Sequence, residues 1–290
     1  MERITVEQLW QMLTLRPDGE EGGELLLTAP DQGQPTDRVF GGLLLAQAVA
    51  AAGHDLPAGV VPLALNADFL SGVPVTGSNT WRVRALGGGR RMATRRVSLL
   101  DEHGDVGFTA TVRLGEVRAD LPSYRTVTPR QVPGPDGLVP LAERYGGDER
   151  LPAWWRIRRP VDLRHVEPPT FLTPVPERAS EQSLWWRLDD GEVVGDPVRT
   201  AAVMAYASDM SLIEPAFRMT GSARHAGGSR ILSLTHTMAF HELVDLTGWV
   251  QMDCAVPSLA HGRALGVGEM HVAGRHVASM SQLALVKLSS

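Results

Sequence analysis

The chain has 290 residues, of which 43% are hydrophobic and 21% charged, and this balance excludes a disordered or low-complexity protein. With 28 basic and 33 acidic residues the formal net charge is -5, so we expect neither nucleic acid nor an anionic membrane as a partner. The single cysteine excludes an intramolecular disulfide and a multi-cysteine zinc site, and the lack of a signal-like or membrane-spanning apolar run predicts a cytoplasmic protein.

The first part of the chain predicts a short helix, a strand and a buried helix. Thr5 with Gln8 three residues later is a capping-box pattern, and the apolar residues that follow share one helical face. We expect the turn residues at 17–19 to end this helix, and residues 24–29 are strand-like. Residues 43–53 consist of good helix formers that are apolar on nearly every side and end in a glycine, which predicts a helix surrounded by the rest of the fold.

Strand patterns follow this buried helix. They cover residues 60–70, 80–85, 92–100 and 106–114, and glycine-containing turns join the last three. Long strands joined by tight turns predict an antiparallel meander, which is a natural surface to curl around one hydrophobic helix.

A proline-rich segment over residues 119–160 then predicts a linker without regular structure. After it the first pattern returns, with a helix over residues 198–210 that Asp196 and Pro197 open. The strand-like segments of this second half are residues 161–166, 184–188, 231–240, 249–256, 263–272 and 276–287.

The repeated order of elements predicts an internal duplication. Residues 63–65 align with residues 232–234, and residues 106–111 align with residues 277–282. The length allows two such units, at roughly 100 to 200 residues per domain. Two unrelated α+β domains with similar strand spacing are the alternative. We expect an N-terminal unit over residues 1–118, a linker over residues 119–160 and a C-terminal unit over residues 161–290.

The candidate catalytic residues are polar groups present in one half only, since no serine-hydrolase, P-loop or dinucleotide-binding motif occurs. Asp209 falls near the end of an otherwise apolar helix, where an ionised carboxylate requires hydrogen-bond partners. Ser233 and Gln282 align with Ala64 and Thr111 of the first half. A carboxylate, a hydroxyl and an amide together can activate and hold a water molecule. The alternative is that Asp209 bonds locally and the other two are ordinary polar strand residues.

Five short segments together resemble the type II acyl-CoA thioesterases (TesB-like). They are residues 39–42, 95–97, 206–209, 236–241 and 277–282, and they occur in the family's order over nearly the whole chain. The resemblance implies an α+β double hotdog fold, in which two tandem units each wrap an antiparallel sheet around a central hydrophobic helix. It also implies an enzyme that hydrolyses acyl thioesters by direct attack of water, with Asp209, Ser233 and Gln282 at the catalytic positions and no covalent acyl-enzyme.

Substrate-binding residues are also expected from this resemblance. Backbone amides near Gly41 and Gly42, at the start of the first buried helix, are candidates to stabilise the oxyanion, and tight helix packing is the alternative explanation for the two glycines. Arg95 and Arg96 are candidates to bind the phosphates of coenzyme A, although adjacent strand residues point to opposite faces, so only one of them can face a cleft. The alternative is that they belong to a solvated charged surface without a partner.

The partners that the resemblance implies are an acyl-CoA or acyl-carrier-protein substrate and further copies of the chain, as a dimer or tetramer. No metal and no cofactor is expected. Residues 66–72 lack the His, aromatic and Arg-Pro-Gly pattern of the family, so the acyl group and its carrier stay open. A non-catalytic acyl-binding protein, or a biosynthetic hotdog protein acting on carrier-bound acyl groups, is the alternative function.

Overall fold

The computed structural model describes residues 3–33, 37–89, 91–189, 195–246 and 248–288. The first half contains every helix and strand that the sequence predicts there, and one strand more. Its elements are α1 (Val6–Leu13), β1 (Arg16–Glu21), β2 (Glu24–Pro30), α2 (Gly41–Ala52), β3 (Val60–Phe69), β4 (Ser78–Gly88), β5 (Met92–Leu100) and β6 (Val106–Glu116).

The second half repeats this order after the linker. Two short helices, α3 (Leu141–Tyr145) and α4 (Ala153–Arg156), lie in the linker. The remaining elements are β7 (Val161–His165), β8 (Glu181–Leu188), α5 (Pro197–Ser208), α6 (Pro215–Thr220), β9 (Arg230–Phe240), β10 (Val250–Ala260), β11 (Arg263–Val272) and β12 (Arg275–Lys287).

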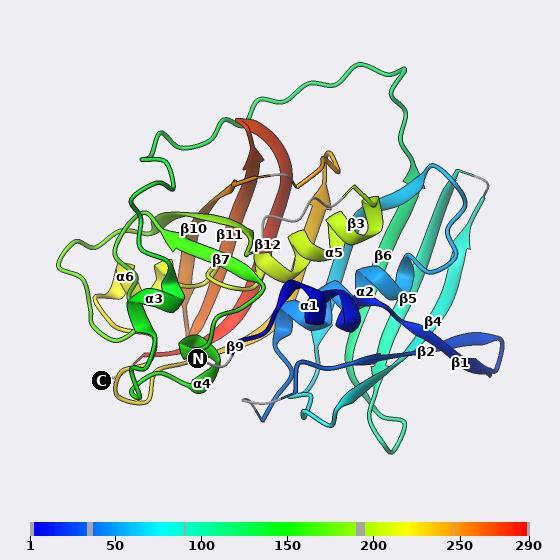
Figure 1. The fold of residues 1–290 in the computed structure, drawn as a ribbon, viewed down its shortest axis with the longest axis horizontal. Coiled ribbons are helices and arrows are strands. Elements are labelled where there is room, and N and C mark those ends of the chain that lie inside the picture. The colour runs from blue at the N-terminus through cyan, green and yellow to red at the C-terminus, as the bar shows by residue number, and fades with distance from the viewer. Residues whose placement is uncertain (1–2, 34–36, 90, 190–194, 247, 289–290) are drawn as a thin grey trace.

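The strands of the described residues form one continuous antiparallel sheet in which the second half mirrors the first (Figure 1). The strand order is β1-β2-β4-β5-β6-β3-β9-β12-β11-β10-β8-β7, so β3 and β9 pair at the centre and β1 and β7 form the two edges. Helix α2 packs against strands β3–β6 of its own half, and α5 packs against α2 and β3. This arrangement confirms the predicted α+β double hotdog.

The central helices α2 and α5 pack side by side in opposite directions. Gly42, at the start of α2, packs against the main chain of Tyr206 near the end of α5, whereas Gly53, just after α2, packs against Val198 at the start of α5. At each end of this helix pair, the C-terminus of one helix therefore lies beside the N-terminus of the other. The long apolar run of α2 is explained by this packing, because Leu43 and Leu45 are completely buried between α5 and the sheet.

The helix caps agree with the sequence pattern. Thr5 and Gln8 form the predicted capping box of α1. The side chain of Asp196 accepts the backbone N–H of Arg199 and caps α5, with Pro197 in its first turn.

Two predictions of local structure are wrong. Residues 17–19 do not end the first helix, which stops at Leu13, and they lie instead in β1, where a bulge and the positive φ of Gly19 make a proline acceptable on an edge strand. The linker is also not without helices. Pro140 and Pro152 stand immediately before α3 and α4, the position at which proline favours a helix start.

The alignment of the two halves also needs correction. A β-bulge skips Leu63 in β3 and another skips Leu234 in β9, so these two leucines are structurally equivalent. Ser233 then corresponds to Pro62 and not to Ala64. Gln282, which pairs with His236, corresponds to Val112 and not to Thr111. The polar difference between the halves is therefore larger than the sequence alignment suggested.

The linker lies along the sheet of the second half before it reaches the helices. The indole of Trp185 donates to the carbonyl of Pro133, and the amide of Gln251 donates to the carbonyl of Arg130. Further on, α4 brings Trp154 against Phe40, with ring centroids 5.0 Å apart. The linker thereby covers one end of the α2–α5 helix pair. Among the described residues, no helix combines the length and the apolar character needed to cross a membrane.

Candidate active site

The three predicted catalytic residues come together at the end of the helix pair where α5 ends and α2 begins. Asp209 is the C-cap residue of α5, Ser233 lies near the start of β9, and Gln282 lies on the neighbouring strand β12. Because β9 and β12 are adjacent and antiparallel, the start of one lies beside the later part of the other. The double hotdog topology thus unites residues that are far apart in the sequence.

Hydrogen bonds join these three side chains into one cluster. The amide Nε2 of Gln282 donates to Asp209 Oδ1 over 2.6 Å and to Ser233 Oγ over 2.8 Å. Asp209 also accepts hydrogen bonds from the Ser233 hydroxyl and from the backbone N–H of Gly42. The carboxylate is therefore held from three sides by groups that favour its ionised form.

Gly41 and Gly42 pack as tightly as the alternative explanation for them expects. A Cβ atom at position 41 would lie 2.5 Å from Asp209 Oδ2, so only glycine leaves room for the carboxylate. A Cβ atom at position 42 would lie 2.4 Å from the carbonyl oxygen of Tyr206. The start of α2 is thus packed tightly against α5, and its Gly42 amide faces the carboxylate of Asp209.

The environment makes Asp209 a better base than an ordinary aspartate. Burial raises its pKa from 3.8 to about 6, although the hydrogen bond from Gln282 and the positive charge of Arg224 oppose this shift. A carboxyl group with a pKa near 6 is mostly ionised at neutral pH and accepts a proton more readily than one at 3.8. Strong perturbation of a group in a cleft is typical of a functional site.

A cavity of about 510 Å³ opens beside the cluster. The lining is mixed and comes from the linker, the segment before α2, the turn after α5 and the strands β9 and β12. Besides the cluster, its polar residues are Asp37, Arg38, Ser211 and Arg224. The apolar lining residues are Phe40, Pro152, Ala153, Trp154, Trp155, Met210, Leu212, Ile213 and Ile231.

Arg224 also lines the cavity, and no sequence pattern had predicted it as a site residue. Its guanidinium stacks over Trp155 at 4.5 Å from the ring centroid, and Nη1 donates to the carbonyl of Met210 over 3.2 Å. Arg224 lies between α6 and β9, a region for which no element was predicted. Trp154 and Trp155, on α4, line the cavity beside Arg224. Their place in the cavity wall depends on the path of the linker, which sequence patterns do not reveal.

A buried ion pair supports the turn that follows Asp209. Glu214 is completely buried, and His165 Nε2 lies 2.9 Å from its Oε2. Burial acts to raise the pKa of Glu214, but the charge and hydrogen bond of His165 outweigh it and hold this pKa at about 2. Gln182 donates to the carbonyl of Ser211 in the same turn. The wall formed by residues 210–214 is therefore rigidly held.

The two predicted phosphate-binding arginines lie elsewhere. Arg95 is half-buried and donates to the carbonyls of Ala52 and His54, so it caps the C-terminal end of α2, which is the other end of the helix pair. Arg96 points to the opposite face and is exposed, as the alternation along a strand requires. Neither residue lines the cavity that contains Asp209, so the structure does not bring them into the candidate site.

Comparisons with known proteins agree with this architecture. Residues 29–115 match the family model described as the acyl-CoA thioesterase N-terminal domain, and residues 135–286 match the model of the acyl-CoA thioesterase C-terminal domain. A curated relative, acyl-coenzyme A thioesterase 8 of Rattus norvegicus, is 25% identical over 252 residues, which cover 79% of this chain and 75% of the relative.

Solved structures share the fold over nearly the whole chain. A tesB protein of Mycobacterium avium subs paratuberculosis superimposes with a TM-score of 0.78 at 25% identity, covering 98% of this chain and 100% of the other. An acyl-CoA thioesterase II, TesB2, of Mycobacterium marinum does so with a TM-score of 0.76 at 24% identity, covering 97% and 98%.

The fold and the two family matches define the class of this protein as a double hotdog thioesterase. The chain belongs to the acyl-CoA thioesterase family.

Proposed function

We propose that the protein hydrolyses acyl-CoA by direct attack of a water molecule that Asp209 activates. The observation that carries this proposal is the hydrogen-bonded cluster of Asp209, Ser233 and Gln282 beside a cavity, with an aspartate pKa of about 6. The acyl-CoA substrate is proposed from the names of the relatives, which are acyl-CoA thioesterases.

The chemistry requires one base and one source of positive potential. Asp209 takes a proton from the water as its oxygen attacks the thioester carbonyl, and a tetrahedral intermediate forms. The C–S bond then breaks, and the proton on Asp209 passes to the departing thiolate, so that a carboxylic acid and free coenzyme A leave. Ser233 and Gln282 orient the carboxylate and the water. The N-terminal end of α2, which begins at Gly41, lies next to the site and favours the developing negative charge.

The acyl group is placed along the apolar part of the cavity. Phe40, Trp154 and Ile231 provide apolar surface next to the catalytic cluster. Burial of each methylene group contributes about 0.8 kcal/mol, so these walls favour an acyl chain over a polar group. Arg95 and Arg96 have no part in this proposal, since neither lines the cavity.

The test is steady-state hydrolysis of a panel of acyl-CoAs, from short to long, measured by release of the free thiol. We expect turnover by the wild type, and a loss of at least about 100-fold in kcat/KM for both Asp209→Asn and Gln282→Ala. Val198→Ala, at the other end of the helix pair, is the matched control and should keep its activity. Equal activity of the variants would contradict the catalytic assignment. If the panel is not hydrolysed at all, the acyl-CoA assignment fails and carrier-protein-bound thioesters take its place.

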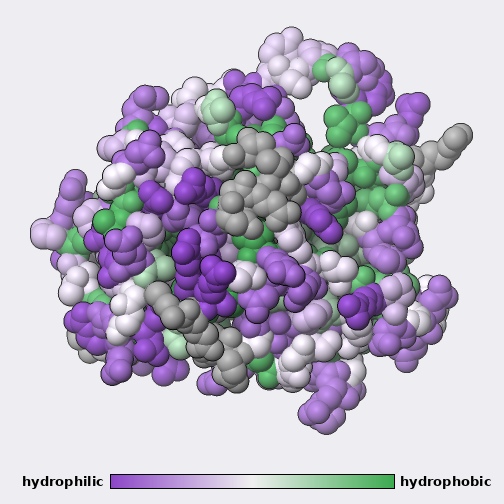
Figure 2. Space-filling view, viewed as in Figure 1, coloured by the Kyte–Doolittle hydropathy of each residue, from purple (hydrophilic) through white to green (hydrophobic). Residues whose placement is uncertain are grey.

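We also propose that the chain forms homo-oligomers. The first part of the linker stands clear of the body near the upper edge of the molecule (Figure 2) and carries exposed apolar side chains. Val117, Leu121 and Tyr124 are 66%, 55% and 87% exposed. Such side chains gain by contact with a second copy. Light scattering after size-exclusion chromatography should give the molar mass of a dimer or tetramer. The Tyr124→Ser variant should shift the equilibrium towards the monomer. A monomeric wild type would contradict this proposal.

A further inference from the structure

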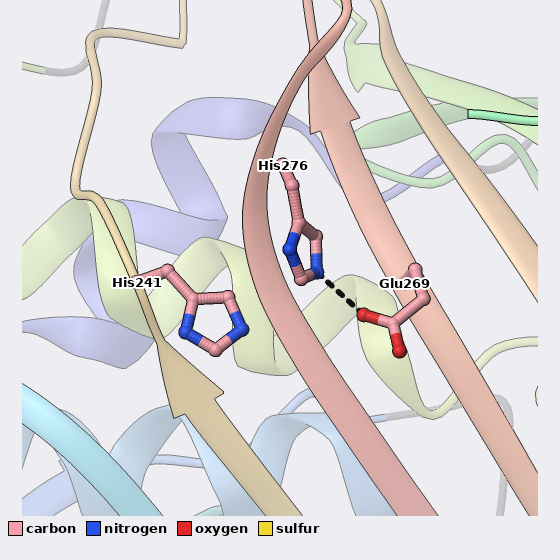
Figure 3. A group of neighbouring side chains, drawn as sticks. All are labelled: His241, Glu269 and His276. Carbon is pink, nitrogen blue, oxygen red and sulfur yellow. Dashed lines mark hydrogen bonds and ion pairs between the residues drawn. The ribbon is translucent and has the colours of Figure 1, made fainter. Parts of the chain in front are cut away.

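A second group of polar side chains lies outside the active site, at the far end of the strands that carry it. His241 follows the end of β9, Glu269 lies on β11, and His276 lies on β12 (Figure 3). Ser233 lies near the opposite end of β9 from His241, so the two sites are well separated along the strand. The thioesterase mechanism uses none of these three residues.

The three side chains point toward one space. One ligand atom from each, an imidazole nitrogen or a carboxylate oxygen, lies within 4.8 Å of the others. His276 Nε2 lies 2.5 Å from Glu269 Oε2, and His241 Nε2 lies 2.9 Å from the hydroxyl of Ser279. That hydroxyl also donates to Glu269 and lies 3.1 Å from His276 Nε2, so it contacts all three side chains.

From this geometry we propose that His241, Glu269 and His276 form a binding site for a divalent transition-metal ion, represented by Zn²⁺. Two imidazoles and one carboxylate are a ligand set that zinc uses in proteins, and a water molecule completes four-coordination. The exposure of His241 leaves that fourth position open to solvent. Tetrahedral zinc places its ligand atoms about 3.4 Å apart. The widest pair, within 4.8 Å, therefore closes by up to about 1.4 Å, and the His276–Glu269 pair, at 2.5 Å, opens by about 0.9 Å.

The surroundings support a cation between these residues. Glu269 is the carboxylate that faces the histidines, because the neighbouring Glu242 is held by Arg125 and Arg275 at 3.0 and 2.8 Å.

The ligands are also held in place from behind. Arg125, on the linker, donates to the carbonyl of His276 over 3.0 Å and to that of His241 over 3.4 Å. The ring of His271 packs against that of His276 with centroids 5.2 Å apart. These contacts fix the main chain at both histidines and the ring of His276. A bound ion would join three adjacent regions of the sheet, β9, β12 and β11, directly beneath the linker.

Nitrogen ligands set the selectivity of the site. Two imidazoles favour zinc, cobalt, nickel or copper over magnesium and calcium, which prefer all-oxygen ligands. Zn²⁺ and Co²⁺ are therefore the probes, and Mg²⁺ is the negative control.

The test is metal binding by the full chain after treatment with a chelator. We expect one Zn²⁺ per chain by calorimetry, and visible absorption from Co²⁺ that Zn²⁺ displaces and excess Mg²⁺ does not. Glu269→Gln and His241→Gln should each weaken Zn²⁺ binding by at least tenfold. His241 is exposed, so its variant should fold normally. His103→Ala removes an exposed histidine of the first half and should bind as the wild type does.

A second readout is thermal stability. Saturating Zn²⁺ should raise the melting temperature of the wild type and of His103→Ala, but not that of Glu269→Gln. The proposal is overturned if the wild type shows no saturable binding, or if Glu269→Gln and His241→Gln bind Zn²⁺ as tightly as the wild type. These outcomes do not depend on thioester hydrolysis.

Discussion

The two ends of the α2–α5 helix pair are built alike and differ in chemistry. At one end the residue after α5 is Asp209, which lies against Gly41 at the start of α2. At the other end the residue after α2 is Gly53, where an added Cβ atom would lie 2.4 Å from Val198 at the start of α5. A carboxylate in a glycine-lined space at one end is thus matched by an apolar contact at the other.

The same difference extends to the strands. The structural equivalents of Ser233 and Gln282 are Pro62 and Val112, which have no polar side-chain groups. The cavity beside Gly53 and Val198 measures about 290 Å³, whereas the cavity beside Asp209 measures about 510 Å³. The comparison teaches that the double hotdog provides two geometrically similar positions, and that the position at Asp209 holds the hydrogen-bonded cluster on which the proposed catalysis depends.

The largest expected effect is loss of activity at the polar end. Asp209→Asn keeps the size of the side chain but removes the base, and we expect kcat/KM to fall by about 1,000-fold, within the usual range for a general base. Thiol release under steady-state conditions measures it. Val198→Ala, which changes the apolar end, should stay within about twofold of the wild type.

The Asp209→Asn variant should also be more stable to unfolding than the wild type at high pH. A carboxyl whose pKa rises from 3.8 to about 6 on folding destabilises the native state by about 3 kcal/mol once it is ionised. Asn avoids this charge but loses the hydrogen bond from Gly42, which contributes about 1 kcal/mol. We therefore expect Asp209→Asn to gain about 2 kcal/mol at pH 8.

The sign of this effect follows from the raised pKa. Below pH 3.8 Asp209 is protonated in both states and adds no penalty, and above pH 6 the penalty is complete. The advantage of Asp209→Asn should accordingly appear between pH 4 and pH 6. Urea unfolding at several pH values measures it, and an advantage independent of pH would show that the carboxylate is not strained by burial.

The next largest effects are expected from glycine substitutions at the two ends of the α2–α5 helix pair. Gly41→Ala would place a Cβ atom 2.5 Å from Asp209 Oδ2, so the carboxylate must move, and kcat should fall by about 10- to 100-fold. Gly53→Ala produces a similar clash with Val198 at the other end. It should lower the melting temperature while the folded protein keeps its kcat. A similar loss of kcat in both variants would mean that only the packing of the helices matters.

The smallest expected effect concerns Ser233. Ser233→Ala removes a hydrogen bond to Asp209 and one from Gln282, and kcat/KM should fall by about tenfold. Ser233→Thr retains the hydroxyl and should stay within about threefold of the wild type. If Ser233→Ala retained full activity, the hydroxyl would have no part in positioning the water.

Much of the fold could be predicted from local patterns. The capping box at Thr5, the apolar helix of residues 43–53 and the Asp196-Pro197 start of α5 are features that neighbouring residues determine, and all three are present. The three catalytic candidates were found because a carboxylate on a buried helix demands partners, and the structure brings Ser233 and Gln282 to it.

The remaining features depend on contacts between distant segments. The strand pairing makes Leu63 and Leu234 equivalent, and the short sequence pattern that aligned the two halves did not reveal this register. The cavity wall requires the linker to fold back, so Trp154 could not be assigned to it in advance. Arg95 was assigned to substrate from the resemblance alone, whereas its half-buried place lets it cap α2.

The most direct test of the central claim is the pH dependence of kcat/KM for the best acyl-CoA substrate between pH 4.5 and pH 8.5. Because Asp209 must be ionised to accept the proton of water, activity should rise with pH around a pKa of about 6 and level off above it. At pH 5 it should be about tenfold below the plateau. The residual activity of Asp209→Asn should lack this rise. A flat profile for the wild type, or the same rise in Asp209→Asn, would contradict a base at Asp209.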